Sequence, residues 1–168
     1  MTIDTIFVER PDLMRVGERE LRCAIGANGF SNSTFEGSKT TPVGLYALRA
    51  GYYRPDIFLT APQSSIPLSP IKPDDGWCDA PSHPRYNLPV KLPFDGSHER
   101  LWRDDKTYDI IIPIGYNDDP IVSGKGSAIF FHIAQPDFRP TLGCVAISLA
   151  DMVALLPHIS TNTKIKIG

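Results

Sequence analysis

The sequence predicts a mainly β domain: a β-rich sheet or sandwich with one helix after residue 144 and a long proline-rich loop. Glycine and proline, 13 and 16 of the 168 residues, favour many turns and few long helices. Short alternating segments recur, whereas only one segment has helical spacing. The length suits about one domain, and 42% hydrophobic residues suffice for one core. We therefore expect a single domain over residues 1–168.

Alternation of polar and apolar side chains predicts the strands in order. Residues 20–26 (ELRCAIG) alternate, and residues 43–50 resemble a second strand. Residues 108–115 and 127–134 predict two more strands. The turn-rich segment NDDPIVSGKG joins them, so we expect a hairpin with a long loop.

The helix signal lies near the end of the chain. Ser148 can cap the segment SLADMVALLPHI, which carries Asp151 three positions later and an apolar face. This helix should end near Pro157. The alternating residues 164–167 (KIKI) then predict a closing edge strand.

A loop-rich stretch covers residues 54–96, where nine prolines would break helix interiors and central strands. We expect a long irregular excursion here, and long ordered loops in compact domains tend to be functional.

Charge and cysteine usage narrow the partners and the compartment. Lys plus Arg number 17 and Asp plus Glu 19, so the net charge of −2 provides no basic excess for nucleic acid. The N-terminus lacks the pattern of a secretory signal, and no apolar run is long enough to span a membrane. Three widely spaced cysteines do not suggest a disulfide framework. We expect a cytoplasmic protein, or a periplasmic one if an export segment was removed.

Residues 130–148 carry the strongest chemical signal. His132 lies in a predicted strand, and Cys144 follows twelve residues later, just before the predicted helix. Backbone N–H groups and the positive end of a helix dipole at that junction would favour the thiolate and could bind an oxyanion. Gly143 would let the backbone approach a substrate closely. Cysteine acyl transfer needs these groups, although a buried structural cysteine and a packed histidine fit the spacing too.

His132 followed by TLGCV at 141–145 resembles the active-site signature of the L,D-transpeptidase catalytic domain (YkuD-like) family. Residues 39–44 (KTTPVG) resemble the family's TPxG segment, and residues 126–132 (GSAIFFH) resemble the strand that carries its histidine. These blocks fall in order between about residue 39 and residue 150, so the resemblance covers most of the chain.

The resemblance implies that Cys144 is the nucleophile and His132 its general acid and base. It places Thr141 and Gly143 in the turn that binds the oxyanion and positions the substrate. Family members attack the carbonyl between an L-centre and a D-residue in peptidoglycan stem peptides, typically diaminopimelate to D-alanine, and release D-alanine from a thioester. An amine acceptor then gives a crosslink, whereas water makes the enzyme an L,D-carboxypeptidase.

Three departures from the family pattern favour hydrolysis. Many members have a histidine and an arginine or asparagine where this chain has Leu142 and Ala146, and the interval between histidine and cysteine is also shorter. With no visible export signal, the sequence resembles the cytoplasmic branch that trims recycled tetrapeptides to tripeptides. Crosslinking or D-amino-acid exchange is the alternative, and an inactive domain that binds wall peptides is a second one.

A substrate that ends in a carboxylate needs a cationic partner, for which arginine is well suited. The candidates are Arg139, Arg103 and Arg85, and Trp102 and Trp77 could wall a groove for a short peptide.

The remaining polar clusters are assigned no role. Cys78, His83 and His98 lack the paired spacing of a zinc site, and the acidic residues of 104–109 are expected to be solvated. We therefore expect no metal and no cofactor.

Overall fold

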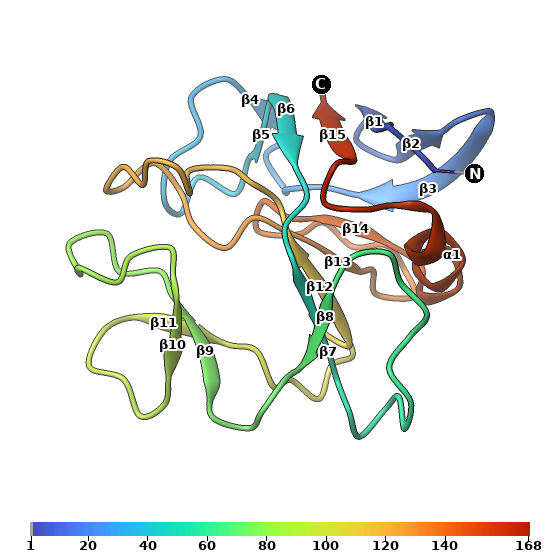
Figure 1. The fold of residues 1–168 in the computed structure, drawn as a ribbon. Helices are drawn as coiled ribbons and strands as arrows, with labels where there is room; N and C mark the ends of the chain where they lie inside the picture. Colours follow the sequence, from blue (N-terminus) through green and yellow to red (C-terminus); the bar gives the residue numbers. More distant parts are fainter. Residues whose placement is uncertain (1) are drawn as a thin grey trace.

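The computed structural model describes residues 2–168, and a large curled sheet dominates them (Figure 1). Ten strands lie in the order β6 (Gly44–Ala47), β15 (Lys164–Ile167), β1 (Thr5–Arg10), β2 (Leu13–Val16), β3 (Arg19–Ala24), β14 (Val145–Ile147), β13 (Phe130–Ile133), β12 (Ile110–Pro113), β7 (Gly51–Tyr53) and β8 (Leu68–Pro70). A second sheet has the order β10 (Pro89–Lys91), β9 (Asp75–Cys78), β11 (His98–Arg100), and β4 (Phe30–Ser31) pairs with β5 (Thr41–Pro42). The predicted mainly β class is confirmed.

The large sheet curls until its edge strand β6 meets the chain that follows β12. The amide of Gly115 donates to Ala47 O at 2.8 Å, and the amide of Arg49 donates to Pro113 O at 2.9 Å. These bonds join one end of β6 to the other half of the sheet, and the curled sheet encloses the main core. The core joins side chains of β1 and β2, such as Ile6 and Met14, to those of the other half of the sheet.

A second hydrophobic cluster lies between the small sheet and the large one. It contains Trp77 of β9, Phe130 of β13, Tyr108 and Cys144. The small sheet is thus packed against the part of the large sheet that carries the histidine and the cysteine.

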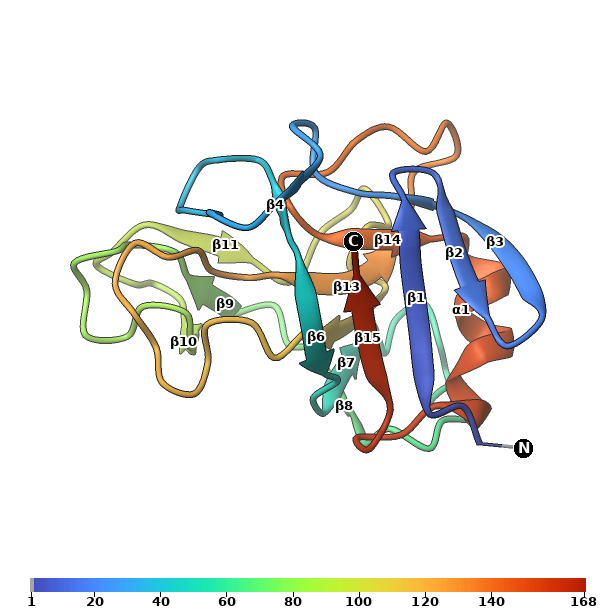
Figure 2. The same cartoon turned by 90° about the horizontal axis from the view of Figure 1, so that it is seen from above.

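The hairpin and the helix were predicted correctly. β12 and β13 are antiparallel, with Ile111 opposite His132. Helix α1 (Leu149–Leu155) follows an N-cap at Ser148, whose Oγ accepts a hydrogen bond from the Asp151 amide at 3.1 Å. A 3-10 turn, η1 (Leu156–His158), contains Pro157 and ends the helical segment. Figure 2 shows α1 beside β2 and β3.

Two predictions about strands were wrong. Residues 164–167 form β15, which is not an edge strand, because it lies between β1 and β6. Alternation identifies one buried face but says nothing about how many neighbours a strand has. The stretch 54–96 is not irregular throughout either, because it contains β8, β9 and β10. Its prolines stand at strand ends there, as Pro70 and Pro89 do.

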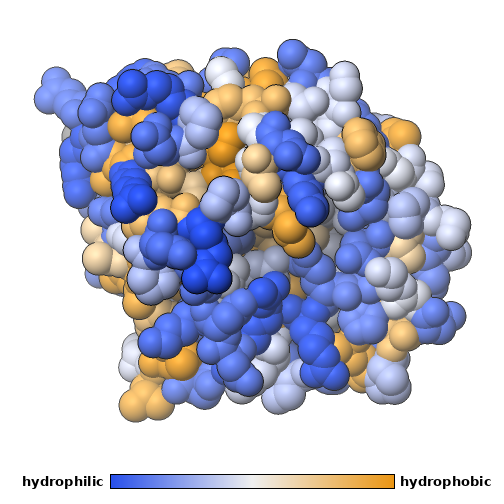
Figure 3. Space-filling view, turned by 180° about the vertical axis from the view of Figure 1, so that it is seen from behind, coloured by the Kyte–Doolittle hydropathy of each residue, from blue (hydrophilic) through white to orange (hydrophobic). Residues whose placement is uncertain are grey.

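The face opposite that of Figure 1 carries small hydrophobic patches separated by hydrophilic residues (Figure 3). Within residues 2–168, no helix combines the length and the apolar character needed to cross a membrane.

Candidate active site

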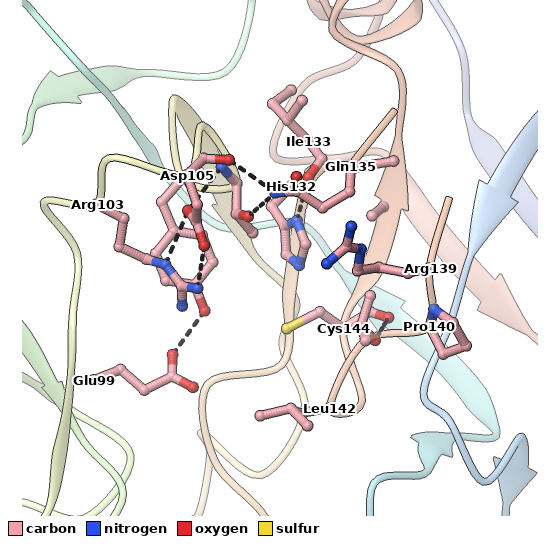
Figure 4. Close-up of a pocket in the computed structure, with 15 residues that line it drawn as sticks. Glu99, Arg103, Asp105, His132, Ile133, Gln135, Arg139, Pro140, Leu142 and Cys144 are labelled. Atoms are coloured by element: carbon pink, nitrogen blue, oxygen red, sulfur yellow. Dashed lines mark hydrogen bonds and ion pairs between the residues drawn. The ribbon is translucent and has the colours of Figure 1, made fainter. Parts of the chain in front are cut away.

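The parallel pairing of β13 and β14 brings His132 and Cys144 together. His132 lies opposite Ala146, and Cys144 precedes β14 by one residue. Because alternate residues of a strand share a face, Cys144 and Ala146 point to the same side as His132. Both His132 and Cys144 line a cavity of about 340 Å³ (Figure 4).

The thiol of Cys144 is buried, with 7% of the residue exposed. Its Sγ donates to Ala128 O at 3.2 Å and accepts a hydrogen bond from the Phe130 amide at 3.4 Å. Burial raises the pKa of Cys144 to about 12, and the nearby Glu99 carboxylate raises this pKa further. The free protein therefore holds a neutral thiol.

The expectation of a thiolate at a helix N-terminus was wrong. Strand β14 (Val145–Ile147) separates Cys144 from the N-cap Ser148, so the sulfur is not at the end of α1. The helix dipole acts only within the first turn, and desolvation dominates instead.

His132 is held as a neutral imidazole, and among the described residues 2–168 its Nε2 has no hydrogen-bond partner. Its Nδ1 lies 2.9 Å from Ile133 O, and because a carbonyl only accepts, Nδ1 carries the proton. Burial lowers the pKa of His132 to about 4. The ring meets Tyr108 edge to face at 5.4 Å between centroids. Figure 4 shows the sulfur of Cys144 beside the end of the ring that is remote from Ile133.

The turn before Cys144 is fixed by two threonines. Thr141 Oγ1 donates to Cys144 O at 2.7 Å and accepts from the Gly143 amide at 3.1 Å. Thr41 of β5 donates its Oγ1 hydrogen to Gly143 O at 2.9 Å. Gly143 has φ +137°, a value that favours glycine. Segments 39–44 and 141–145 are therefore in direct contact, and the hydrogen bond from Thr41 stabilises the turn before Cys144.

Among the predicted substrate-binding residues, Thr141, Arg139 and Arg103 line the cavity. Arg139 Nε contacts Asp137 at 3.1 Å in an exposed ion pair, and Arg103 pairs with Asp105. Both guanidinium groups border the space in front of Cys144 (Figure 4).

The structure does not bring Arg85, Trp77 or Trp102 to this cavity. Arg85 lines a separate hollow and donates to Pro89 O at 2.9 Å. Trp77 packs on Phe130, with ring centroids 5.0 Å apart, and lies behind the site. The guanidinium of Arg54 stacks on the ring of Trp102, with Cζ 3.9 Å from the ring centroid. The geometry therefore gives no support to the prediction that these three side chains contact a substrate.

Sequence reasoning missed Glu99 and Tyr108, which also line the cavity. Tyr108 donates its phenol hydrogen to Glu99 Oε2 at 2.7 Å, and the Arg103 guanidinium lies 4.8 Å from the Tyr108 ring centre. Tyr108, the nearer of the two in sequence, lies 24 residues before His132, so no local sequence motif connects these residues with His132 and Cys144. The only signal in the sequence was the proline-rich excursion itself, whose last part leads into β11.

The loop between β11 and β12 is anchored at both sides. Arg54 donates to Arg103 O, and Gln135 Nε2 donates to Asp105 O and to Thr107 Oγ1, both at 2.8 Å. These bonds hold Arg103 in place at the mouth of the cavity.

The family model of the L,D-transpeptidase catalytic domain (YkuD) matches residues 4–167, nearly the whole chain. The chain belongs to this family. It is therefore an enzyme domain of the L,D-transpeptidase family, whose members act on peptidoglycan peptides. A search of curated proteins and a search of solved structures gave no significant match. Within residues 2–168, His, Cys, Asp and Glu side chains form no group of three that could hold a metal ion.

Proposed function

We propose that this L,D-transpeptidase-family domain is a cysteine L,D-carboxypeptidase that removes the terminal D-alanine from peptidoglycan tetrapeptides, in the cytoplasm and in the recycling of wall peptides. One observation carries the proposal: the Cys144 thiol and the free nitrogen of His132 face one small cavity. At about 340 Å³ the cavity is at the low end of the range for ligand pockets, which suits a short free peptide.

Because Cys144 and His132 are both neutral in the free protein, the first half-reaction begins with a proton transfer from the thiol to the imidazole. His132 Nε2 takes the thiol proton as Sγ of Cys144 attacks the carbonyl carbon on the L-centre side of the scissile bond. The S–C bond forms, and the C–N bond to D-alanine then breaks. The imidazolium gives its proton to the leaving nitrogen. The products of this step are free D-alanine and a thioester, with His132 neutral again.

The second half-reaction uses the same two residues. Water attacks the thioester carbon and gives a proton to His132, the C–S bond breaks, and the thiol of Cys144 regains a proton from the imidazolium. Tripeptide leaves with a new carboxylate. Arg139, which lines the cavity, supplies a charge for the carboxylate of the terminal D-alanine.

The cavity wall near the cysteine supports water as the acceptor. Leu142 and Ala146 line it where many family members carry polar side chains, so fewer groups are present to orient an incoming stem peptide. Crosslinking remains the second candidate because both activities share the thioester.

Mass spectrometry of the protein with a free tetrapeptide, with and without excess D-amino acid, tests the proposal. We expect tripeptide that lacks one D-alanine and little exchange product. Cys144→Ala should give no product and keep its circular dichroism spectrum, while Cys23→Ala should stay active because Cys23 lies in the main core. Exchange products or dimers would establish the transpeptidase instead. A folded wild-type protein without any product would favour the binding domain.

A further inference from the structure

The sulfur of Cys144 is held by two backbone groups for which the mechanism above has no use. The carbonyl of Ala128 accepts the thiol hydrogen, and the amide of Phe130 donates to Sγ. Figure 4 shows that the sulfur lies beside the ring of His132. Ala128 has φ +52°, a left-handed conformation that residues other than glycine rarely adopt unless their surroundings hold them. The position of the sulfur therefore depends on what holds Ala128.

Asn87 holds Ala128 through its side-chain amide. Its Oδ1 accepts hydrogen bonds from the Ala128 amide at 3.0 Å and from Trp77 Nε1 at 2.9 Å. Its Nδ2 donates to Asn117 O at 2.8 Å and to Tyr116 O at 3.4 Å. Because both N–H donors meet the oxygen and both carbonyls meet the nitrogen, only one orientation of this amide satisfies all four groups. The residue is 5% exposed, so water offers little replacement for these bonds.

Asn87 is itself fixed, and it lies apart from the substrate. It belongs to the proline-rich stretch, between β9 and β10, and its backbone amide donates to Cys78 O at 2.9 Å. Its φ of +56° suits asparagine, which tolerates the left-handed region better than most residues. Together with Trp77 and Phe130 it lines a small hollow that is separate from the catalytic cavity. An effect of Asn87 on the reaction therefore has to pass through Ala128.

We propose that Asn87 is a positioning residue for the nucleophile: by holding Ala128, it keeps Sγ of Cys144 beside His132 for the transfer of the thiol proton. When Nε2 takes this proton, the hydrogen bond to Ala128 O is lost. The Phe130 amide goes on donating to the sulfur, whose electron pair then attacks the carbonyl carbon of the substrate. This inference rests on the proposed function only for Cys144 as the nucleophile, a role that hydrolysis and crosslinking share.

Steady-state kinetics with a free tetrapeptide test the proposal. Asn87→Gly keeps the left-handed backbone and removes the acceptor for Ala128. It should lower kcat about 10- to 100-fold, the cost of misplacing a reacting group by about 1 Å, and leave KM nearly unchanged. Asn87→Asp keeps an oxygen for the Ala128 amide and should retain more of kcat. If the glycine variant does not fold, Asn87→Ser, whose side chain is shorter than that of asparagine by one bond, should show the same loss.

Asn117→Gly is the matched control. Asn117 is also buried, has φ +51°, and uses its side chain to bind Val122 and Gly126. This variant should melt at a lower temperature than the wild type and keep its kcat. The positioning role would be overturned by an equal fall of kcat in the control, by a rise of KM in place of the fall in kcat, or by an unchanged kcat in a folded Asn87→Gly protein. A wild-type protein that releases no D-alanine would overturn the proposed function, and this inference with it.

Discussion

Cys144 in the free enzyme should be alkylated as a neutral thiol. With a pKa of about 12, the thiolate fraction at pH 7 is about 10⁻⁵, against about 3 in 100 for an unperturbed cysteine. This is a difference of about three orders of magnitude in reactive species. Because the pair starts neutral, the rate should rise about tenfold per pH unit up to pH 10 without a plateau.

Peptide-level mass spectrometry after timed exposure to iodoacetamide measures this rate from pH 6 to pH 10. The pH slope is the readout, because burial also slows the reagent itself. Cys23, whose pKa burial also raises to about 12, is the internal control, and denatured protein gives the reference profile. His132→Asn should leave the slope unchanged, since a neutral imidazole stabilises no thiolate. A plateau with a midpoint below pH 8 that disappears in this variant would refute the neutral pair.

Three further outcomes test the fold around the site. Because the pKa of His132 is about 4 when folded and 6.5 when unfolded, falling pH protonates the unfolded chain first, and stability is lost between these values. Urea unfolding should show about 3 kcal/mol less stability from this residue at pH 4 than at pH 7, a loss that His132→Gln avoids. Thr41→Val should cost about 1–3 kcal/mol and lower kcat, because it removes the bond to Gly143 O; an unchanged Tm and kcat would contradict this. Gly143→Ala should unfold more easily than Gly124→Ala, since its Cβ would lie 2.9 Å from Thr40 O whereas that of Gly124 meets open space; equal melting temperatures would count against this contact.

The candidate nucleophile and base were found from sequence because one short segment carries both. His132 lies on β13, and Cys144, only twelve residues later, directly precedes the parallel strand β14. The short sequence motif therefore already contains both residues that the fold brings together. The hairpin that carries His132 also followed from local alternation and turn residues. The position of β15 did not, because which strands flank it depends on β1 and β6, more than 100 residues away.

The ionisation of Cys144 could not be read from sequence either. The residues after it, Val145–Ile147, form a strand that separates Cys144 from the helix N-cap at Ser148, whereas the prediction placed Cys144 at the junction with the helix. A short apolar run fits both structures. Only the packing of Cys144 into the cluster with Trp77 and Phe130 shows that burial, rather than a helix dipole, controls the thiol.

The choice between water and an amine is made by side chains other than Cys144 and His132. Cys144 and His132 produce the same thioester in either case, so their presence cannot separate a carboxypeptidase from a transpeptidase. One wall of the cavity, with Glu99 and Arg103, comes from β11 and the loop after it, which the small sheet and the bonds from Arg54 and Gln135 hold against β13. The shape and the charge of this cavity therefore depend on tertiary contacts between distant segments of the chain.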